Sequence, residues 1–178
     1  STVQRVIFNG DTLPKGFISA ITLDEFDSND GVEAVKVCLK NIDKTIYIPK
    51  QMSQIGIETA IFHLEGCSLT EADTYLFDSA YRFANVADSA FLAAMEECFT
   101  NNNEEAKEFL KKNSTRIVDK LLEEEDESGL ERISRLGVVS EEQLKRIGEL
   151  AERKEWAALS AYVMNQVDDS DDEDTFSL

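Results

Sequence analysis

The chain has 178 residues, of which 36 are acidic and 18 basic, giving a net charge of −18 at neutral pH. This charge disfavours direct binding to nucleic acids or anionic membranes, because both need positive charge opposite their phosphates. No apolar run reaches the roughly 18 residues that a membrane-spanning helix needs. We therefore expect one globular domain or two small ones, without a secretory signal, in the cytoplasm.

The acidic excess continues into the part of the chain that should fold. Between Gln51 and Ala106 there are ten acidic residues and one basic residue, Arg82, together with seven phenylalanines and tyrosines. Disordered acidic segments lack such large apolar residues, because they have no core to bury. We therefore expect a folded surface rich in carboxylates, which would attract a basic protein partner in a salt-sensitive manner.

Short β-branched and aromatic runs predict a small N-terminal sheet. Val3–Phe8 and Phe17–Leu23 flank a loop of turn-forming residues, which predicts two antiparallel strands. A third strand is predicted at Lys44–Ile48. The run Ile57–Leu64 fits either a fourth strand or part of a helix, and a strand is the interpretation we favour.

One helix is predicted within this N-terminal region, from about Gly31 to Asn41. The acidic loop Asp24–Asp30 before it has a superficial likeness to a calcium-binding loop. With Gly31 at the invariant sixth position, however, the first and twelfth ligands would be Phe26 and Val37, which carry no side-chain oxygen. An acidic turn with a helix cap is the better interpretation.

From Ser68 onward the apolar residues recur at helical spacing, and no strand is predicted. Ser68 with Glu71 and Ser140 with Gln143 have the spacing of capping boxes. The predicted helices cover about 69–84, Val86–Phe99, Glu104–Lys112, Thr115–Leu122, Gly129–Leu136, Glu141–Arg153 and Glu155–Val167.

These elements predict an α+β fold, with a small N-terminal antiparallel sheet and one helix followed by a mostly helical C-terminal region of six or seven helices. The predicted domains are residues 1–66 and 67–167, with Asn101 as an alternative boundary. Residues 168–178 contain six carboxylates and are predicted to be a disordered acidic tail.

No motif for catalysis or metal binding is present. His63 is the only histidine, and Cys38, Cys67 and Cys98 form no CxxC pair. A metal site or a Cys–His dyad at His63 could therefore form only with Cys67 or a cysteine remote in the sequence, and free thiols in a reducing compartment are expected. A glycine-rich phosphate loop is also missing. We expect no enzyme activity and no cofactor.

One helical segment resembles a known repeat. Leu150–Leu159 is similar to the second half of an ankyrin repeat, but the Thr-Pro-Leu-His signature is missing from the chain. We therefore predict no repeat array, and expect the apolar residues of this region to pack in a helical core.

In size, charge and acidic folded stretch, the chain resembles the acidic anti-defence proteins of phages and mobile elements. These include type II anti-CRISPR inhibitors of Cas9 and antirestriction proteins that mimic DNA, and as a rule they are not enzymes. The resemblance implies an inhibitor that occupies the basic channel in which an effector holds DNA. The carboxylates expected to contact the partner are Glu71, Asp73, Asp78, Asp88, Glu96, Glu97, Glu104, Glu105, Glu123, Glu124, Glu125, Asp126 and Glu127.

The alternative is a helical adaptor that binds a protein through an apolar groove. The affinity of such an adaptor should change little with salt, whereas that of a DNA mimic should fall steeply. A small enzyme is a third hypothesis, which would require a pocket with a perturbed titratable group.

Overall fold

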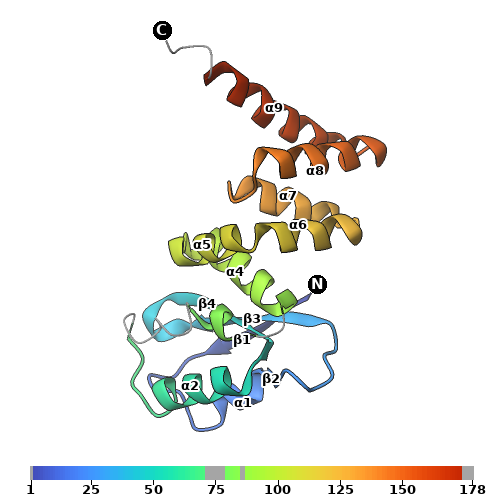
Figure 1. Ribbon diagram of the computed structural model, residues 1–178. Helices are drawn as coiled ribbons and strands as arrows, with labels where there is room; N and C mark the ends of the chain where they lie inside the picture. The colour runs from blue at the N-terminus through green and yellow to red at the C-terminus, as the bar shows by residue number, and fades with distance from the viewer. Residues whose placement is uncertain (1, 71–78, 85–86, 174–178) are drawn as a thin grey trace. The chain divides into compact units, whose positions relative to one another are not determined.

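The computed structural model describes residues 2–70, 79–84 and 87–173 (Figure 1). It divides into two compact units, residues 1–107 and residues 108–178, which we call unit 1 and unit 2. The division lies well beyond residue 66 and nearer to the alternative at Asn101. Unit 1 contains a small sheet, and the chain that follows is mostly helical, so the predicted α+β class is confirmed.

Unit 1 is built around a three-stranded sheet with the order β1-β3-β4. Strand β1 (Thr2–Phe8) runs parallel to β3 (Val32–Leu39), and β3 is antiparallel to β4 (Lys44–Pro49). The strands predicted over 3–8 and 44–48 are therefore confirmed. The sheet is mixed and not purely antiparallel, because the strand that follows β1 in the sheet is reached by a long crossover.

Three other predictions for unit 1 are wrong. The second predicted strand forms helix α1 (Phe17–Ile21), followed by β2 (Leu23–Asp24), which pairs in parallel with β5 (Gln51–Met52). The predicted helix over 31–41 is strand β3. Its residues alternate between buried and less buried, and pairing with strands on both sides outweighs the helical spacing of its valines.

The third error concerns the run after β5, which forms helix α2 (Gln54–Leu64) and not a strand. Ser53 is the N-cap of α2, and its hydroxyl accepts a hydrogen bond from the Gly56 N–H at 3.1 Å. This cap is a sequence signal that favours a helix.

The helix predicted over about 69–84 lies mostly outside the described residues, as does Glu71 of its predicted cap. At its described ends, Ser68 forms an isolated β-bridge with Thr12, and Ala80–Phe83 is the 3-10 helix η2.

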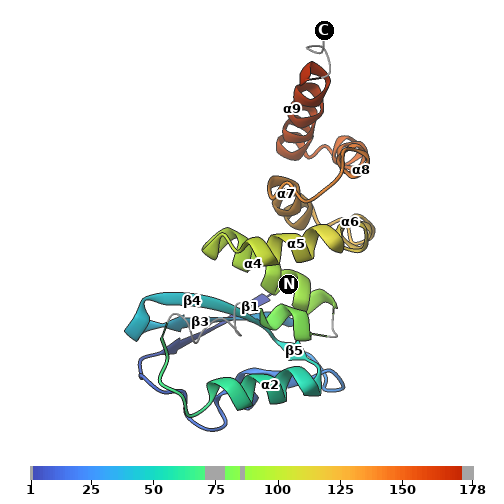
Figure 2. The ribbon, with the colours of Figure 1, turned by 60° about the vertical axis from the view of Figure 1, so that its left-hand side comes forward.

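The sheet of unit 1 lies between helices, as Figure 2 shows. Helix α4 (Ala87–Asn101) packs against β3 and β4 on one face. Helices α1 and α2 cover the other face. The fully or nearly fully buried side chains on that side include Leu13, Ile18, Val35, Val37, Leu39, Ile46, Ile48, Met52 and Leu64.

The remaining elements are helices: α5 (Glu104–Lys112), α6 (Ser114–Glu123), α7 (Glu127–Arg135), α8 (Glu141–Arg153) and α9 (Ala157–Glu173). All five predicted helices of this region are confirmed. Residues 168–173, expected to belong to a disordered tail, continue α9, since propagating an existing helix needs far less free energy than starting one. Residues 174–178 lie outside the described part of the chain.

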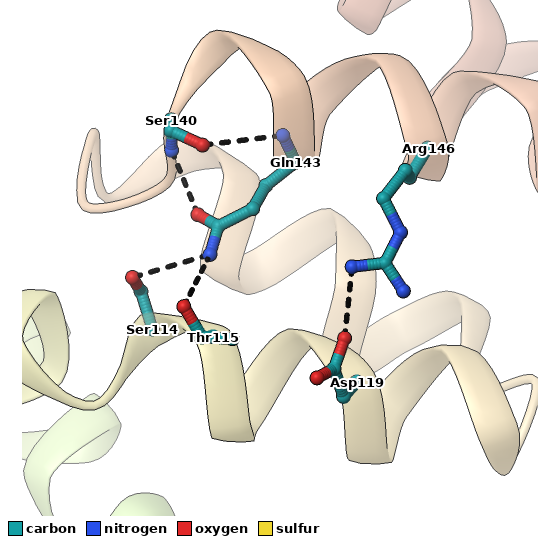
Figure 3. A network of polar contacts seen from close by, with 6 residues as sticks. All are labelled: Ser114, Thr115, Asp119, Ser140, Gln143 and Arg146. Atoms are coloured by element: carbon teal, nitrogen blue, oxygen red, sulfur yellow. Dashed lines mark hydrogen bonds and ion pairs between the residues drawn. The ribbon is translucent and has the colours of Figure 1, made fainter.

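A buried glutamine joins α8 to α6 within unit 2 (Figure 3). The Gln143 N–H and side-chain oxygen form the predicted capping box with Ser140, which is confirmed. The remaining Nε2 of Gln143 donates to the hydroxyls of Ser114 and Thr115, both at 3.3 Å. Nearby, Arg146 pairs with Asp119 at 2.8 Å. These polar groups serve to hold the helices together.

Two helices of unit 2 share the same type of C-terminal cap. Helices α6 and α8 end in the same way: the Asp126 N–H donates to the Leu121 carbonyl at 3.0 Å, and the Trp156 N–H donates to the Ala151 carbonyl at 2.9 Å. These bonds are the long bonds of Schellman motifs, and equivalent residues are 30 positions apart. The connections α6–α7 and α8–α9 therefore begin with the same cap geometry.

The residue after each helix end adopts a left-handed conformation that normally favours glycine. Glu155 follows α8 with a φ of 59°. We expect Glu155→Gly to raise the free energy of unfolding by about 1 kcal/mol, because glycine carries no steric penalty there. Glu152→Gly, three residues earlier inside the same helix, should lower it by about 1 kcal/mol. Urea unfolding followed by Trp156 fluorescence measures both, and equal signs would contradict the prediction.

Candidate protein-binding surface

The structure places the predicted partner-binding carboxylates of unit 1 in different environments. Glu71, Asp73 and Asp78 lie outside the described residues. On α5, Glu104 and Glu105 are exposed, and Glu105 pairs with Arg82 at 2.8 Å. The other three acids lie on α4: Asp88 and Glu96 are half-buried, and Glu97 is buried.

Glu97 is a correction to the predicted site, because its side chain is fully buried. Its carboxylate accepts hydrogen bonds from the Tyr47 N–H at 2.7 Å and from the Asn101 amide at 2.6 Å. The same Asn101 amide donates to the Thr45 carbonyl at 2.9 Å. Glu97 and Asn101 therefore form hydrogen bonds with backbone N–H and carbonyl groups along the outer edge of β4. Such an edge would otherwise be open to pairing with another chain.

The five acids 123–127 form the corner between α6 and α7 in unit 2. Asp126 is the N-cap of α7 and accepts from the Gly129 N–H at 3.0 Å. Glu124 pairs with Lys120 at 3.8 Å, and Glu125 pairs with Lys154. Glu123 and Glu127 are exposed. The corner is acidic, and three of its five carboxylates already form a cap or an ion pair within unit 2.

A different surface stands out on α2, which carries large apolar residues on its outer side as well as on the side that faces the core. Gly56, Ala60 and Leu64 face the core and are buried. Ile55 and Phe62 face outward and are 74% and 80% exposed. They are seven residues apart, which is two helical turns, so they lie on one stripe. Large apolar side chains gathered on an exposed face are typical of a surface that a partner covers. We call the outer stripe, comprising 55, 58, 59 and 62, the α2 face.

The start of α2 is fixed by Phe83 on the 3-10 helix η2 (Ala80–Phe83). The N–H and hydroxyl of Ser53 both donate to the Phe83 carbonyl, at 3.1 Å and 2.7 Å. Gly56 lies so close that a Cβ there would be 2.5 Å from the Phe83 Cβ. Only glycine permits this approach, and η2 therefore sets the position of the first turn of α2.

The end of α2 is anchored to α1. Glu65 follows the helix, and its carboxylate accepts from the N–H groups of Gly16 at 2.9 Å and Ile18 at 3.0 Å. With both ends held, the α2 face is a firm support for its exposed side chains. Binding to such a surface requires little ordering of the backbone.

A second exposed aromatic residue belongs to the loop that joins β2 to β3. Phe26 is 89% exposed. The Asp24 carboxylate accepts from the Phe26 N–H at 3.1 Å, and Gln51 donates from Nε2 to the Asp27 carbonyl at 2.7 Å. The loop is therefore tied to β5, which leads directly into α2. Its acids Asp24 and Asp27 and the exposed Phe26 belong to the same part of unit 1.

Sequence reasoning missed the α2 face because 58, 59 and 62 lie in the run 57–64, for which a strand was the favoured interpretation, and Ile55 lies outside that run. Isoleucine and phenylalanine are also residue types that usually lie in the core, and only the fold shows that Ile55 and Phe62 face outward. His63, which was weighed as a metal ligand, packs edge-on against Phe62 with ring centres 4.9 Å apart. Within the described part of the chain, no cluster of three His, Cys, Asp or Glu could hold a metal ion.

Two groups with shifted pKa values lie in unit 1, and both are shifted away from reactivity at neutral pH. Burial raises the pKa of the Cys98 thiol to about 11, and the neighbouring Glu97 carboxylate adds to the effect. Burial likewise raises the pKa of Tyr81 to about 12, against the opposing influence of Arg82. A nucleophilic cysteine needs the opposite shift.

The Tyr81 shift predicts a loss of stability in alkali. The fold favours the neutral phenol, so this stabilisation is complete below the ordinary tyrosine pKa near 10 and is lost as the pH rises toward 12. We expect the free energy of unfolding to fall more steeply between pH 10 and pH 12 in the wild type than in Tyr81→Phe. Urea titrations at several pH values measure the difference, and parallel curves would contradict the prediction.

No protein-family model, no curated protein and no solved structure matches this chain. No helix in its described part combines the length and apolar character that crossing a membrane requires. Among the described residues, we base the functional argument on the α2 face and on the acidic corner.

Proposed function

We propose that this protein is a non-enzymatic module that binds a partner protein through the α2 face. The observation that carries the proposal is the exposure of Ile55 and Phe62 on one stripe of a firmly held helix. Burying one such side chain contributes roughly 1.5–3 kcal/mol, so the pair could supply a large part of a binding free energy. The surface is a convex helix face, whereas the adaptor hypothesis from the sequence assumed a groove.

The charge of the chain supports a basic partner. Unit 1 has 17 acidic and 8 basic residues, and unit 2 has 19 acidic and 10 basic residues, so each has a net charge of −9. Such a field speeds the approach of a positively charged protein and keeps copies of this chain apart. The three cysteines are free, which supports a reducing setting such as the cytoplasm.

The test is recovery of partners from cells by the tagged full-length protein. In the double variant Ile55→Ser, Phe62→Ser, we expect the affinity for the recovered partner to fall about 100-fold or more, because two apolar contacts are lost. Met164→Ser is the matched control, since Met164 is 58% exposed on α9 of unit 2. Circular dichroism verifies that each variant is folded. Partners retained equally by the double variant would contradict the proposal.

A second candidate function is inhibition of a nucleic-acid-binding effector such as a Cas9-type nuclease, by blocking its engagement with DNA. The acidic corner 123–127 supports it, because exposed carboxylates gather there in a unit of net charge −9. Occupation of a basic DNA channel needs such a surface and no chemistry.

The second candidate has its own test, binding to guide-loaded Cas9 with and without target DNA at several salt concentrations. The informative variant is Glu123→Gln, Glu124→Gln, Glu127→Gln. It leaves Asp126 to cap α7 and Glu125 to pair with Lys154. Binding that DNA abolishes and this variant weakens supports inhibition. Absence of binding, or binding unchanged in the variant, contradicts it.

A further inference from the structure

We infer that the partner contributes an amphipathic helix with Lys or Arg beside its apolar stripe. This inference rests on the proposed function and specifies which kind of element binds the α2 face. Its basis is the spacing of the two exposed apolar side chains and the position of the one carboxylate between them.

The spacing on the α2 face fits a helix. Two turns separate Ile55 from Phe62, which is about 10.5 Å along the axis. A partner helix presents side chains of one stripe at the same interval of seven residues, so its ridges can pack beside both. An extended strand repeats the side chains of one face about every 7 Å, and residues about 10 Å apart point to opposite faces. A single strand therefore matches the pair poorly.

The charge on the α2 face requires a cation from the partner. Glu58 lies on the stripe between Ile55 and Phe62, is exposed, and accepts a hydrogen bond from Gln54 at 2.9 Å. Docking of an apolar surface would take this carboxylate out of water, which is unfavourable unless a basic group pairs with it. No Lys or Arg is present on α2 itself. The partner helix must supply the cation.

A second copy of this chain is a poor occupant by the same reasoning. Pairing two α2 faces would bring two copies of Glu58 into one interface with no Lys or Arg from either helix. Two chains of net charge −18 also repel each other. A basic helix from a different protein meets neither obstacle. Asp24 and Asp27, on the loop tied to β5, add to the negative charge of unit 1.

The experiment is selection of displayed random peptides of 20 residues on the full-length protein. Peptides that also bind Ile55→Ser, Phe62→Ser are removed. We expect the enriched peptides to carry large apolar residues at intervals of three, four and seven, with Lys or Arg beside them. A synthetic peptide of this kind should become helical on binding. Its affinity should fall about tenfold in Glu58→Gln and be unchanged in Glu152→Gln, which alters an exposed carboxylate of unit 2.

Several results would overturn the inference. One is enrichment of peptides whose apolar residues alternate or whose charged residues are acidic. Another is that no peptide depends on the α2 face for binding. A third is a peptide affinity that is the same for the wild type and Glu58→Gln. Sedimentation showing a dimer that Phe62→Ser dissociates would identify a second copy as the occupant instead. If a cellular partner still depends on Ile55 and Phe62 while the peptides are not helical, the proposed function stands and only the helical partner is wrong.

Discussion

Replacing Glu97 with alanine should lower the free energy of unfolding by about 3 kcal/mol. The truncation leaves the buried Tyr47 N–H without its acceptor, and an unpaired buried donor costs about 1–3 kcal/mol, to which the empty volume adds. It also releases Asn101 from the carboxylate. Urea unfolding measures the change. Hydrogen exchange of the β4 amides should increase more than that of unit 2.

Two further variants test whether the loss comes from the hydrogen bonds of the Glu97 carboxylate. Glu97→Gln keeps one oxygen acceptor but brings an amide donor to the amide of Asn101, so a smaller loss than in Glu97→Ala is expected. Glu96→Ala, on the half-buried neighbour, should lose less than 1 kcal/mol. If Glu97→Ala lost no more than Glu96→Ala, the carboxylate would not be a structural element of the β4 edge.

Gly56→Ala should also lower the free energy of unfolding by about 3 kcal/mol, although the same change in an ordinary helix raises it by about 1 kcal/mol. The added methyl group would lie 2.5 Å from the Phe83 Cβ and 3.1 Å from the Phe83 carbonyl oxygen. Relief requires a shift of α2 or of the backbone at Phe83, and overpacking of this kind costs roughly 1–3 kcal/mol, with lost hydrogen bonds of Ser53 in addition.

Gly148→Ala provides the matched control for Gly56→Ala. Gly148 also lies within a helix, α8, but a Cβ there would be 3.1 Å from a terminal methyl group of Val163, which can move more easily than backbone. We expect a change of less than about 1 kcal/mol in either direction. A stable Gly56→Ala protein with unchanged exchange at α2 would show that α2 is not fixed by η2.

The helices after residue 86 could be predicted from the sequence because their signals are local. Ser140 and Gln143 define the start of α8, and apolar residues at intervals of three and four define its length. The elements of unit 1 could not be predicted as well, because β3 forms by pairing with β1 and β4, which are remote from each other in the sequence. Spacing alone does not distinguish a short apolar strand from a helix.

The candidate site illustrates the same limit. Glu96 and Glu97 are neighbours of identical chemistry, and only the packing of α4 on the sheet buries one of them. Ile55 and Phe62 are of residue types that usually lie in the core, and only the position of α2 leaves them exposed. Burial depends on contacts between distant segments, so neither the correction at Glu97 nor the α2 face was accessible from composition and spacing.

The most direct test of the central claim is photo-crosslinking from the α2 face inside cells. A benzophenone amino acid at position 62 should capture one predominant protein, and Ile55→Ser in the same chain should reduce the yield strongly. The same amino acid at position 164, on α9, should not capture that protein. A position-62 adduct that depends on Ile55 would support the α2 face as a recognition surface. No adduct at position 62, or the same adducts from both positions, would contradict it.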